Sequence, residues 1–175
     1  MKEAIKEKSG KRRWIRWPVR VGLGILLLSI WHCGAPQRSA GEWIESGIDH
    51  FQAGRYTQAA RAYRQAVEKE PDNAVAHNLL GMAYRFQYNE TGDSAMRERE
   101  TAAFRRAVEL NPRFVVAIKN LAVTMKRDGN HREAARLAGR ALKLFPRDPE
   151  KPLLESWIRQ YSENGDPPAS PQSPR

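Results

Sequence analysis

Histidines and a single cysteine are the residues of this chain whose types most often do chemistry in proteins. His or Cys side chains at short, regular spacing can hold a metal ion, and a cysteine beside a base can act as a nucleophile. None of the four histidines stands at metal-ligand spacing from another histidine or from a cysteine, and the only base near Cys33 is His32. We therefore predict no metal site. The other three histidines are expected to pack in the fold or face solvent: His50, His77 and His131.

Two closely spaced carboxylates, Glu98 and Glu100, are the remaining candidates for acid–base catalysis. They alternate with Arg97 and Arg99 in the string "RERE". Alternating charges are typical of a solvated helix face, so we interpret both glutamates as surface residues. The chain has no glycine-rich phosphate loop and no G-x-S-x-G motif. We predict that the protein is not an enzyme and uses no cofactor.

The basic charge of the chain is concentrated before an apolar segment. The chain has 175 residues and a formal net charge of +10, and residues 1–20 hold eight Lys or Arg against Glu3 and Glu7. The eleven residues from Val21 to Trp31 include one polar side chain, Ser29. A basic region followed by such a run is typical of a secretory signal, and its basic end should stay in the cytoplasm. The high charge therefore indicates targeting, and no nucleic-acid binding is expected.

Residues 1–33 are predicted to be a signal or anchor, and residues 34–40 a tether. A full membrane span needs about 20 residues, which residues 14–33 supply if Arg16 and Arg20 extend toward the interface. This predicts a single-pass protein of the bacterial inner membrane whose C-terminal domain lies in the periplasm. Because Cys33 follows the apolar run directly, two alternatives stay open: a lipid anchor on Cys33, or cleavage and secretion.

Three short strings recur along the rest of the chain: "AVEKEP" at 66–71, "AVELNP" at 107–112 and "ALKLFP" at 141–146. Small and large side chains precede each string at intervals of three or four residues, which places them on one face of a helix. Pro71, Pro112 and Pro146 should end the second helix of each unit, since proline cannot continue the hydrogen-bond ladder. Gly54 and Gly129 are expected to end first helices, where left-handed geometry is common.

This pattern resembles the tetratricopeptide repeat (TPR), W-x2-L-G-x2-Y…A-x3-F…P with a 34-residue period. The resemblance covers about residues 40–148 and implies an all-α, TPR-like α-solenoid of three helical hairpins. The last two prolines are 34 residues apart, but the first two are 41 apart. We interpret the extra residues, near 87–94, as a turn within a tolerated loop insertion, with Asp93 or Ser94 capping the next helix. The alternative is a loop that makes a specific contact.

Two further segments complete the predicted organisation. The string "EKPLLESWIRQY" is predicted to form a C-terminal helix that caps the exposed end of the solenoid. Its apolar face holds Leu153, Leu154, Trp157, Ile158 and Tyr161. The solenoid with its capping helix is thus predicted to span residues 41–163. Residues 164–175 contain four prolines and almost nothing apolar, so they are predicted to be a disordered tail.

In proteins with these repeats, the first helix of each hairpin lines a concave groove. The resemblance therefore implies a set of partner-binding residues: Ile44, Ile48, Phe51, Asn78, Met82, Arg85, Phe86, Lys119, Val123, Lys126 and Arg127. Such a groove is apolar at one end and basic at the other, which suits a protein or peptide partner with apolar side chains and an acidic end. Some relatives hold chaperone tails with a clamp of lysines and asparagines. Ile44 and Ile48 occupy its first-repeat positions, so this clamp is predicted to be absent.

The sequence favours a membrane-tethered scaffold, exposed to the periplasm, that binds a peptide or helix of an envelope protein. The alternative is a structural subunit of an envelope complex or homo-oligomer whose groove is permanently occupied. Fold alone does not choose between them.

Overall fold

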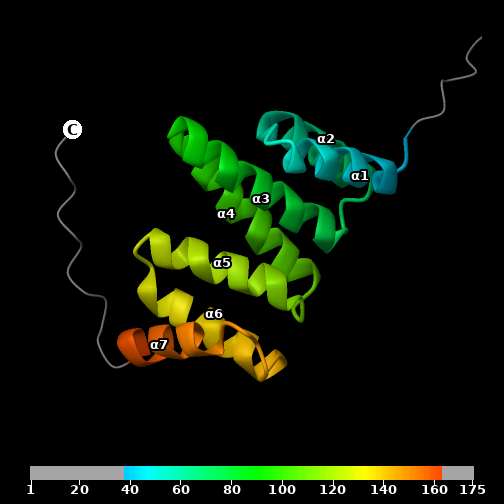
Figure 1. Cartoon of the computed structure of the whole chain (residues 1–175). Helices are drawn as coiled ribbons and strands as arrows, with labels where there is room; N and C mark the ends of the chain where they lie inside the picture. Colours follow the sequence, from blue (N-terminus) through cyan, green and yellow to red (C-terminus); the bar gives the residue numbers. More distant parts are fainter. Residues whose placement is uncertain (1–37, 163–175) are drawn as a thin grey trace, which may run out of the picture. The chain divides into compact units, whose positions relative to one another are not determined.

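The structure, a computed structural model, describes residues 38–162. In this range the chain forms seven α-helices and no strand (Figure 1). They are α1 (Ala40–Gln52), α2 (Tyr56–Lys69), α3 (Ala74–Thr91), α4 (Ser94–Leu110), α5 (Val115–Arg127), α6 (His131–Leu144) and α7 (Lys151–Ser162). The predicted anchor with Cys33, most of the tether and the proline-rich tail lie outside the described residues. Between residues 38 and 162, none of the helices has the length and apolar composition to cross a bilayer.

Local signals in the sequence set the ends of the first helices. Ser39 begins α1 with a capping box: its hydroxyl accepts from the Glu42 N–H at 3.2 Å, and the Glu42 carboxylate accepts from the Ser39 N–H at 2.7 Å. Gly54 and Gly129 follow α1 and α5 with φ of 72° and 80°, in the left-handed region that glycine adopts readily. After each glycine, the next N–H bonds back to the last turn of the helix at 2.9 Å. The prediction that these glycines end helices is confirmed.

The helices pair in chain order, and each packs against the next one (Figure 1). Glycine lets the two helices of a pair approach closely. A Cβ added to Gly47 would lie 2.4 Å from the Tyr63 ring, and one added to Gly81 would lie 2.7 Å from the Phe104 ring. Both rings are almost completely buried. The small and large residues of the repeats therefore fit into one another, and the predicted three hairpins are confirmed.

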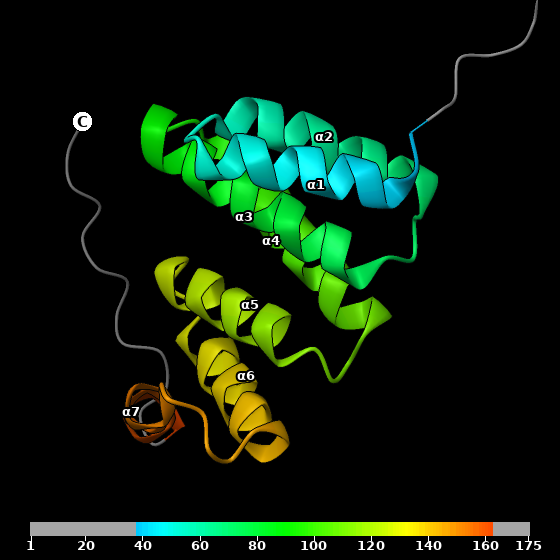
Figure 2. The same ribbon diagram turned by 45° about the vertical axis from the view of Figure 1, so that its right-hand side comes forward.

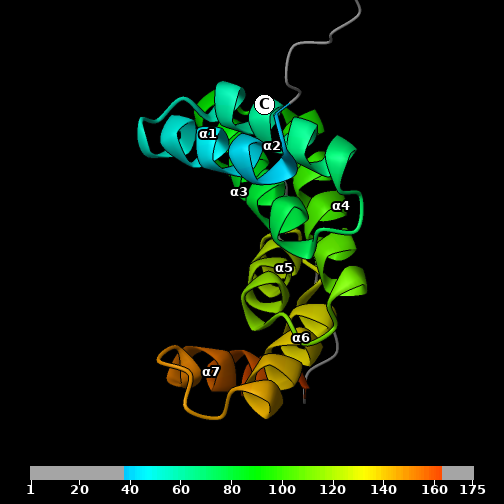
Figure 3. The same ribbon diagram turned by 90° about the vertical axis from the view of Figure 1, so that its right-hand side faces the viewer.

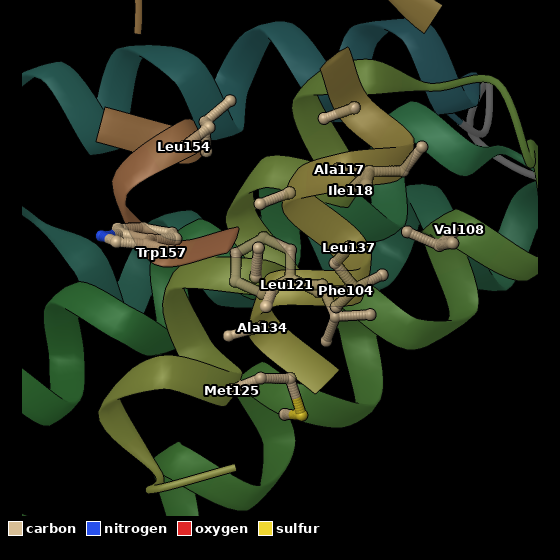
Figure 4. Packing of buried hydrophobic residues seen from close by; sticks show 14 of the residues in the cluster. Phe104, Val108, Ala117, Ile118, Leu121, Met125, Ala134, Leu137, Leu154 and Trp157 are labelled. Carbon is tan, nitrogen blue, oxygen red and sulfur yellow. The ribbon is translucent and has the colours of Figure 1, made fainter. Parts of the chain in front are cut away.

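Two larger clusters of buried apolar side chains, with a small third one around Ala40, Ala66 and Ala76, hold the stack together. The first joins α2, α3 and α4 and includes Tyr63 and Leu80. The larger cluster joins α4 to α5, α6 and α7 and includes Phe104, Ile118 and Leu137 (Figure 4). Burying one such large side chain contributes roughly 1.5–3 kcal/mol before the loss of conformational entropy. Because the larger cluster is continuous from α4 to α7, the third hairpin and the last helix share their core with the second hairpin.

The extra residues of the second repeat lengthen its helices and do not form a loop. α3 has 18 residues and α4 has 17, whereas α1, α2, α5 and α6 have 13 or 14. Only Gly92 and Asp93 lie between α3 and α4, and Asp93 caps α4 by accepting from the Ala95 N–H at 2.9 Å. The predicted loop is therefore wrong, and the predicted Asp93 cap is confirmed. A helical extension satisfies its own backbone hydrogen bonds, which a loop would leave to solvent.

The lengthened ends of α3 and α4 bond to both neighbouring hairpins. Gln87 on α3 donates to the carbonyl of Tyr56, the first residue of α2, at 2.9 Å. On the other side, Arg97 on α4 donates to the Asp128 carboxylate at 2.6 Å and to the Arg127 carbonyl at 3.0 Å, at the end of α5. The added turns thus connect the three hairpins at one end of the stack.

The last helix, α7, packs against α6, as predicted for a capping helix (Figure 2). Leu154, Trp157 and Tyr161 are buried, and Ile158 is partly buried. Leu153 differs, because it lies one residue away from the stripe that contacts α6 and is 49% exposed. The prediction that Leu153 belongs to the buried face is wrong.

Candidate functional site on the first helices

The apolar residues predicted to line a groove at its N-terminal end also pack against the solenoid. Ile44 and Ile48 on α1 are half-buried and lie against the buried alanines of the first hairpin. Phe51 contacts the rings of Tyr56 and Phe86 edge-on, with centroid distances of 5.2 and 5.1 Å. These side chains therefore join α1 to α3, and only their half-exposed edges are free for a partner.

A buried ion-pair network occupies the middle of the predicted groove. Glu100 on α4 is 0% exposed and accepts from the Nε of Arg85 on α3 at 2.8 Å and from Arg127 on α5. The Thr124 hydroxyl donates to the same carboxylate at 2.8 Å. The interpretation of Glu100 as a solvated surface residue is therefore wrong. Its carboxylate is buried because donors from two neighbouring helices replace water.

Polar side chains extend this network along α3 and α5. Asn78 is buried, and its Oδ1 accepts from the Nδ2 of Asn120 at 2.9 Å. Arg85 donates to the Asn120 carbonyl at 2.8 Å. Because Arg85 and Arg127 share the single carboxylate of Glu100, these three groups leave one net positive charge. The basic end of the predicted groove is thus largely neutralised within the fold.

Lys119 on α5 is also paired within the fold. Its ammonium lies 3.0 Å from both carboxylate oxygens of the buried Asp148 and 2.9 Å from Glu150. Burial alone would raise the pKa of Asp148, but hydrogen bonds from the Glu150 N–H and from Lys119 outweigh it and lower that pKa below its ordinary value. Burial alone would lower the pKa of Lys119, but its bonds to Glu150 and Asp148 raise it. The pair fixes the start of α7 against α5.

Acid should weaken this contact in a way that can be measured. Since the folded state favours the charged form of Asp148, its contribution to stability is complete above its unfolded pKa of about 4 and is lost as the pH falls through the lower folded pKa. We expect the Asp148→Asn variant to lose less stability than the wild type between pH 6 and pH 3, measured by urea unfolding. The Glu155→Gln variant is the control, because Glu155 is half-exposed and lies 3.7 Å from Lys151. Equal losses in Asp148→Asn and the wild type would contradict the expectation.

The remaining predicted residues lie near the capping helix or in the adjoining core. Val123 on α5 is 39% exposed, and Met82 on α3 is partly buried against the larger core cluster. The Lys126 ammonium lies 5.0 Å from the centre of the Trp157 ring. This cation–π contact holds Lys126 against α7 without neutralising its charge.

Two exposed valines on the same helix faces were missed from the sequence. Val75 precedes Asn78 by three residues, and Val116 precedes Lys119 by three, so each continues the helical spacing of the predicted residues. Both are about half-exposed, as is Leu153 on α7. Their spacing was a usable signal for the two valines. We call the eleven predicted residues together with Val75, Val116 and Leu153 the first-helix face.

No group of three or more His, Cys, Asp or Glu side chains in the described part of the chain is arranged to hold a metal ion. The first-helix face offers half-exposed aliphatic and aromatic side chains, buried amides and paired cations. Its chemistry suits the binding of a polypeptide.

Stacked helical hairpins with small residues at the close contacts define a solenoid of the TPR type, and comparisons with known proteins agree. Residues 47–85, from within α1 to within α3, match the model of the TPR repeat. A comparison with curated proteins found no match. The predicted TPR-like α-solenoid with a capping helix is confirmed by solved structures.

Three of these structures illustrate the likeness. The first TPR domain of Spaghetti (RPAP3), bound to the HSP90 peptide SRMEEVD, is 22% identical, with a TM-score of 0.61 over 69% of this chain and 91% of that chain. The TPR2B domain of yeast Sti1, in a complex with pHsp70, is 16% identical, with a TM-score of 0.60 over 71% of this chain and 96% of that chain. The Sgt2 TPR domain from Aspergillus fumigatus is 18% identical, with a TM-score of 0.60 over 77% and 88%. At these identities the likeness establishes the fold alone.

Proposed function

We propose that this protein is a membrane-tethered TPR scaffold whose solenoid is exported to the periplasm and binds a peptide or helix of an envelope partner on the first-helix face. The fold supports a role in protein interaction, because structures of the same fold contain bound HSP90 and HSP70 peptides. The basic N-terminal region and the apolar run at Val21–Trp31 support the membrane tether.

The observation that carries the proposal is the position of the exposed apolar side chains. Four of the five exposed large apolar residues in the described chain lie on the first-helix face: Val75, Val116, Val123 and Leu153. In a folded domain such side chains contribute to stability only when something covers them. A partner with apolar side chains would cover them.

Two contacts frame the part of this face that we expect to bind most strongly. Lys119 pairs with Glu150 at one end, and Lys126 lies over Trp157 at the other. Val123 lies between the two lysines on α5, and Leu153 lies between Glu150 and Trp157 on α7. Both framed residues are exposed, and Val123 lies one helical turn before the charged Lys126, which suits an apolar side chain followed by a carboxylate.

Site-specific photocrosslinking in cells tests the binding face. A photoreactive residue at Val123 is expected to capture a defined partner, whereas the same residue at Ala102, exposed on α4, is not. Capture should disappear in the Leu153→Asp variant and persist in Phe145→Asp, because Phe145 is similarly exposed but follows α6 and lies off the first-helix face. Equal capture from both positions would contradict the proposal.

Topology needs a separate test. A reporter enzyme that works only after export should be active when it is fused after Arg175. A reporter enzyme that works only in the cytoplasm should be inactive at the same position. The opposite result would exclude the periplasmic location and leave the binding face untouched.

The exposed apolar side chains of the first-helix face also agree with the second function, a structural subunit with this face permanently covered. Partner copurification at a fixed stoichiometry through a dilution series would favour that function. A stable monomer that binds its partner reversibly would favour the scaffold.

A further inference from the structure

The second helices of the hairpins, α2, α4 and α6, hold the net charge of the described domain. Together they contain eleven basic and five acidic side chains, a net charge of +6. The rest of residues 38–162 contains ten basic and eleven acidic side chains, a net charge of −1. In Figure 3 the second helix of each hairpin lies to the right of the first. The positive charge is therefore concentrated on one side of the stack.

The charge is most regular on α6. Its basic residues follow one another at intervals of four, four and three, on the side opposite the buried alanines Ala134, Ala138 and Ala141. They are Arg132, Arg136, Arg140 and Lys143. A depression of about 430 Å³, lined by small residues of α6, lies among the last three of them. A helix with an apolar inner face and such an outer face is typical of proteins that bind anionic surfaces.

The basic rows of α4 and α6 adjoin each other. Arg140 on α6 donates to the Pro112 carbonyl, just beyond α4. Arg105 on α4 lies close enough to Glu133 on α6 to add, after the stronger effect of Arg136, to the lowering of the pKa of that carboxyl. We call nine basic residues of α2, α4 and α6 the basic face, all of them exposed except the partly buried Arg140: Arg61, Arg64, Arg99, Arg105, Arg106, Arg132, Arg136, Arg140 and Lys143.

The first-helix face and the basic face differ in how many of their cations form ion pairs within the fold. On the first-helix face, Arg85, Arg127 and Lys119 pair with carboxylates of the fold. On the basic face, Arg106 and Arg136 also pair with carboxylates, but Arg132 and Lys143 are exposed and make no ion pair within the described residues. Unpaired, exposed cations are available to an external anion without the loss of an internal contact.

We infer that the basic face docks on a bilayer surface rich in anionic lipid headgroups. This inference rests on the membrane anchor of the proposed function. Six residues separate Cys33 from Ala40, the first residue of α1, and they span at most about 21 Å when extended. The start of α1 therefore stays within a few Debye lengths of the membrane, since the Debye length is about 8 Å at physiological ionic strength, and the domain can turn its basic face toward the bilayer. The cations of the basic face, with Arg132 and Lys143 unpaired, are then attracted to anionic headgroups.

Energy transfer in lipid nanodiscs tests this docking with the full chain. A donor dye on an azide-bearing residue at position 102, on the exposed side of α4, reports the distance to acceptor lipids in the disc. Transfer should be higher in discs of phosphatidylglycerol and phosphatidylcholine than in phosphatidylcholine alone, and 500 mM salt should remove the difference. The Arg132→Glu/Lys143→Glu variant should lose the difference. The control, Arg147→Glu/Arg159→Glu, changes the net charge equally at exposed residues outside α2, α4 and α6 and should keep it.

Each other outcome overturns the inference for an identifiable reason. A chain that does not incorporate into either disc lacks the anchor, so the membrane part of the proposed function fails as well. If the chain incorporates into the discs and energy transfer is equal in both lipids, the docking of the basic face is overturned but the anchor is not. Equal loss in both charge variants assigns the effect to net charge and not to this face. Binding of a short RNA that depends on Arg132 and Lys143, without a lipid effect, assigns the face to nucleic acid.

Discussion

Replacing Glu100 with alanine is expected to lower the free energy of unfolding by about 3 kcal/mol, the lower end of the range for a broken buried ion pair. The carboxylate is 0% exposed, and it accepts hydrogen bonds from Arg85, Arg127 and Thr124. Without it, two cations remain close together with no anion between them. Arg127 is the more exposed of the two arginines and can turn partly toward solvent. The loss of unfolding free energy therefore stays at the lower end of that range.

Two further variants separate the effect of breaking the buried ion pair from the effect of removing one negative charge. Glu98→Ala removes an exposed glutamate from the same helix and should change the unfolding free energy by less than about 0.5 kcal/mol. Adding Arg85→Met and Arg127→Leu to Glu100→Ala should restore part of the lost stability, because the unpaired charges are then gone. Urea unfolding followed by circular dichroism measures all three. If Glu100→Ala and Glu98→Ala have the same effect, the network does not stabilise the fold.

The position of Glu100 shows where a charge pattern misleads. In the first repeat, Ala59, Tyr63 and Ala66 are spaced by four and three residues, and Glu100, Phe104 and Ala107 have the same spacing. Glu100 thus occupies a position that holds a buried alanine in the first repeat. The repeat register placed it in the core, but the alternating string around it indicated a solvated face. The register was the better guide, because helix packing fixes burial and local charge does not.

The fold itself was predictable because it depends on local signals. Gly54, Gly129 and the prolines that follow α2, α4 and α6 mark the helix ends, and the spacing of small and large residues gives the pairing. The lengthened second hairpin was not predictable in the same way. The string around Gly92 contains good turn residues, but Gln87 and Arg97 form their contacts only once the neighbouring hairpins are in place.

The sequence named the residues of the first-helix face but not their charge partners. The resemblance to the repeat named the residues of the face, but ion pairing depends on residues distant in the sequence. Lys119 contacts Asp148, 29 residues further along, and Arg85 contacts Glu100, 15 residues further along. A sequence pattern gives no direct sign of such partners. A face that looked basic in sequence is therefore close to neutral in the structure.

Replacing Gly81 with alanine is expected to destabilise the protein by about 1–3 kcal/mol, although alanine is the better helix former by about 1 kcal/mol. The new Cβ would lie 2.7 Å from the Phe104 ring, closer than two carbon atoms can approach. Phe104 is 0% exposed, with the Arg85 guanidinium 4.8 Å from the centre of its ring. The ring cannot move aside without disturbing both the core and the buried ion pair, so the two helices of the second hairpin must separate.

Gly139 provides the matched control, since it also lies inside a helix but has room for a methyl group. A Cβ there would meet its nearest neighbour, Ile158, at 3.8 Å, an ordinary contact. Gly139→Ala should therefore stabilise the protein by up to about 1 kcal/mol through helix propensity alone. Phe104→Leu should destabilise the wild type by leaving a cavity but should cost less in the Gly81→Ala background, where the smaller side chain relieves the clash. If the effects of Gly81→Ala and Phe104→Leu simply add, the close contact between α3 and α4 is not what requires glycine at position 81.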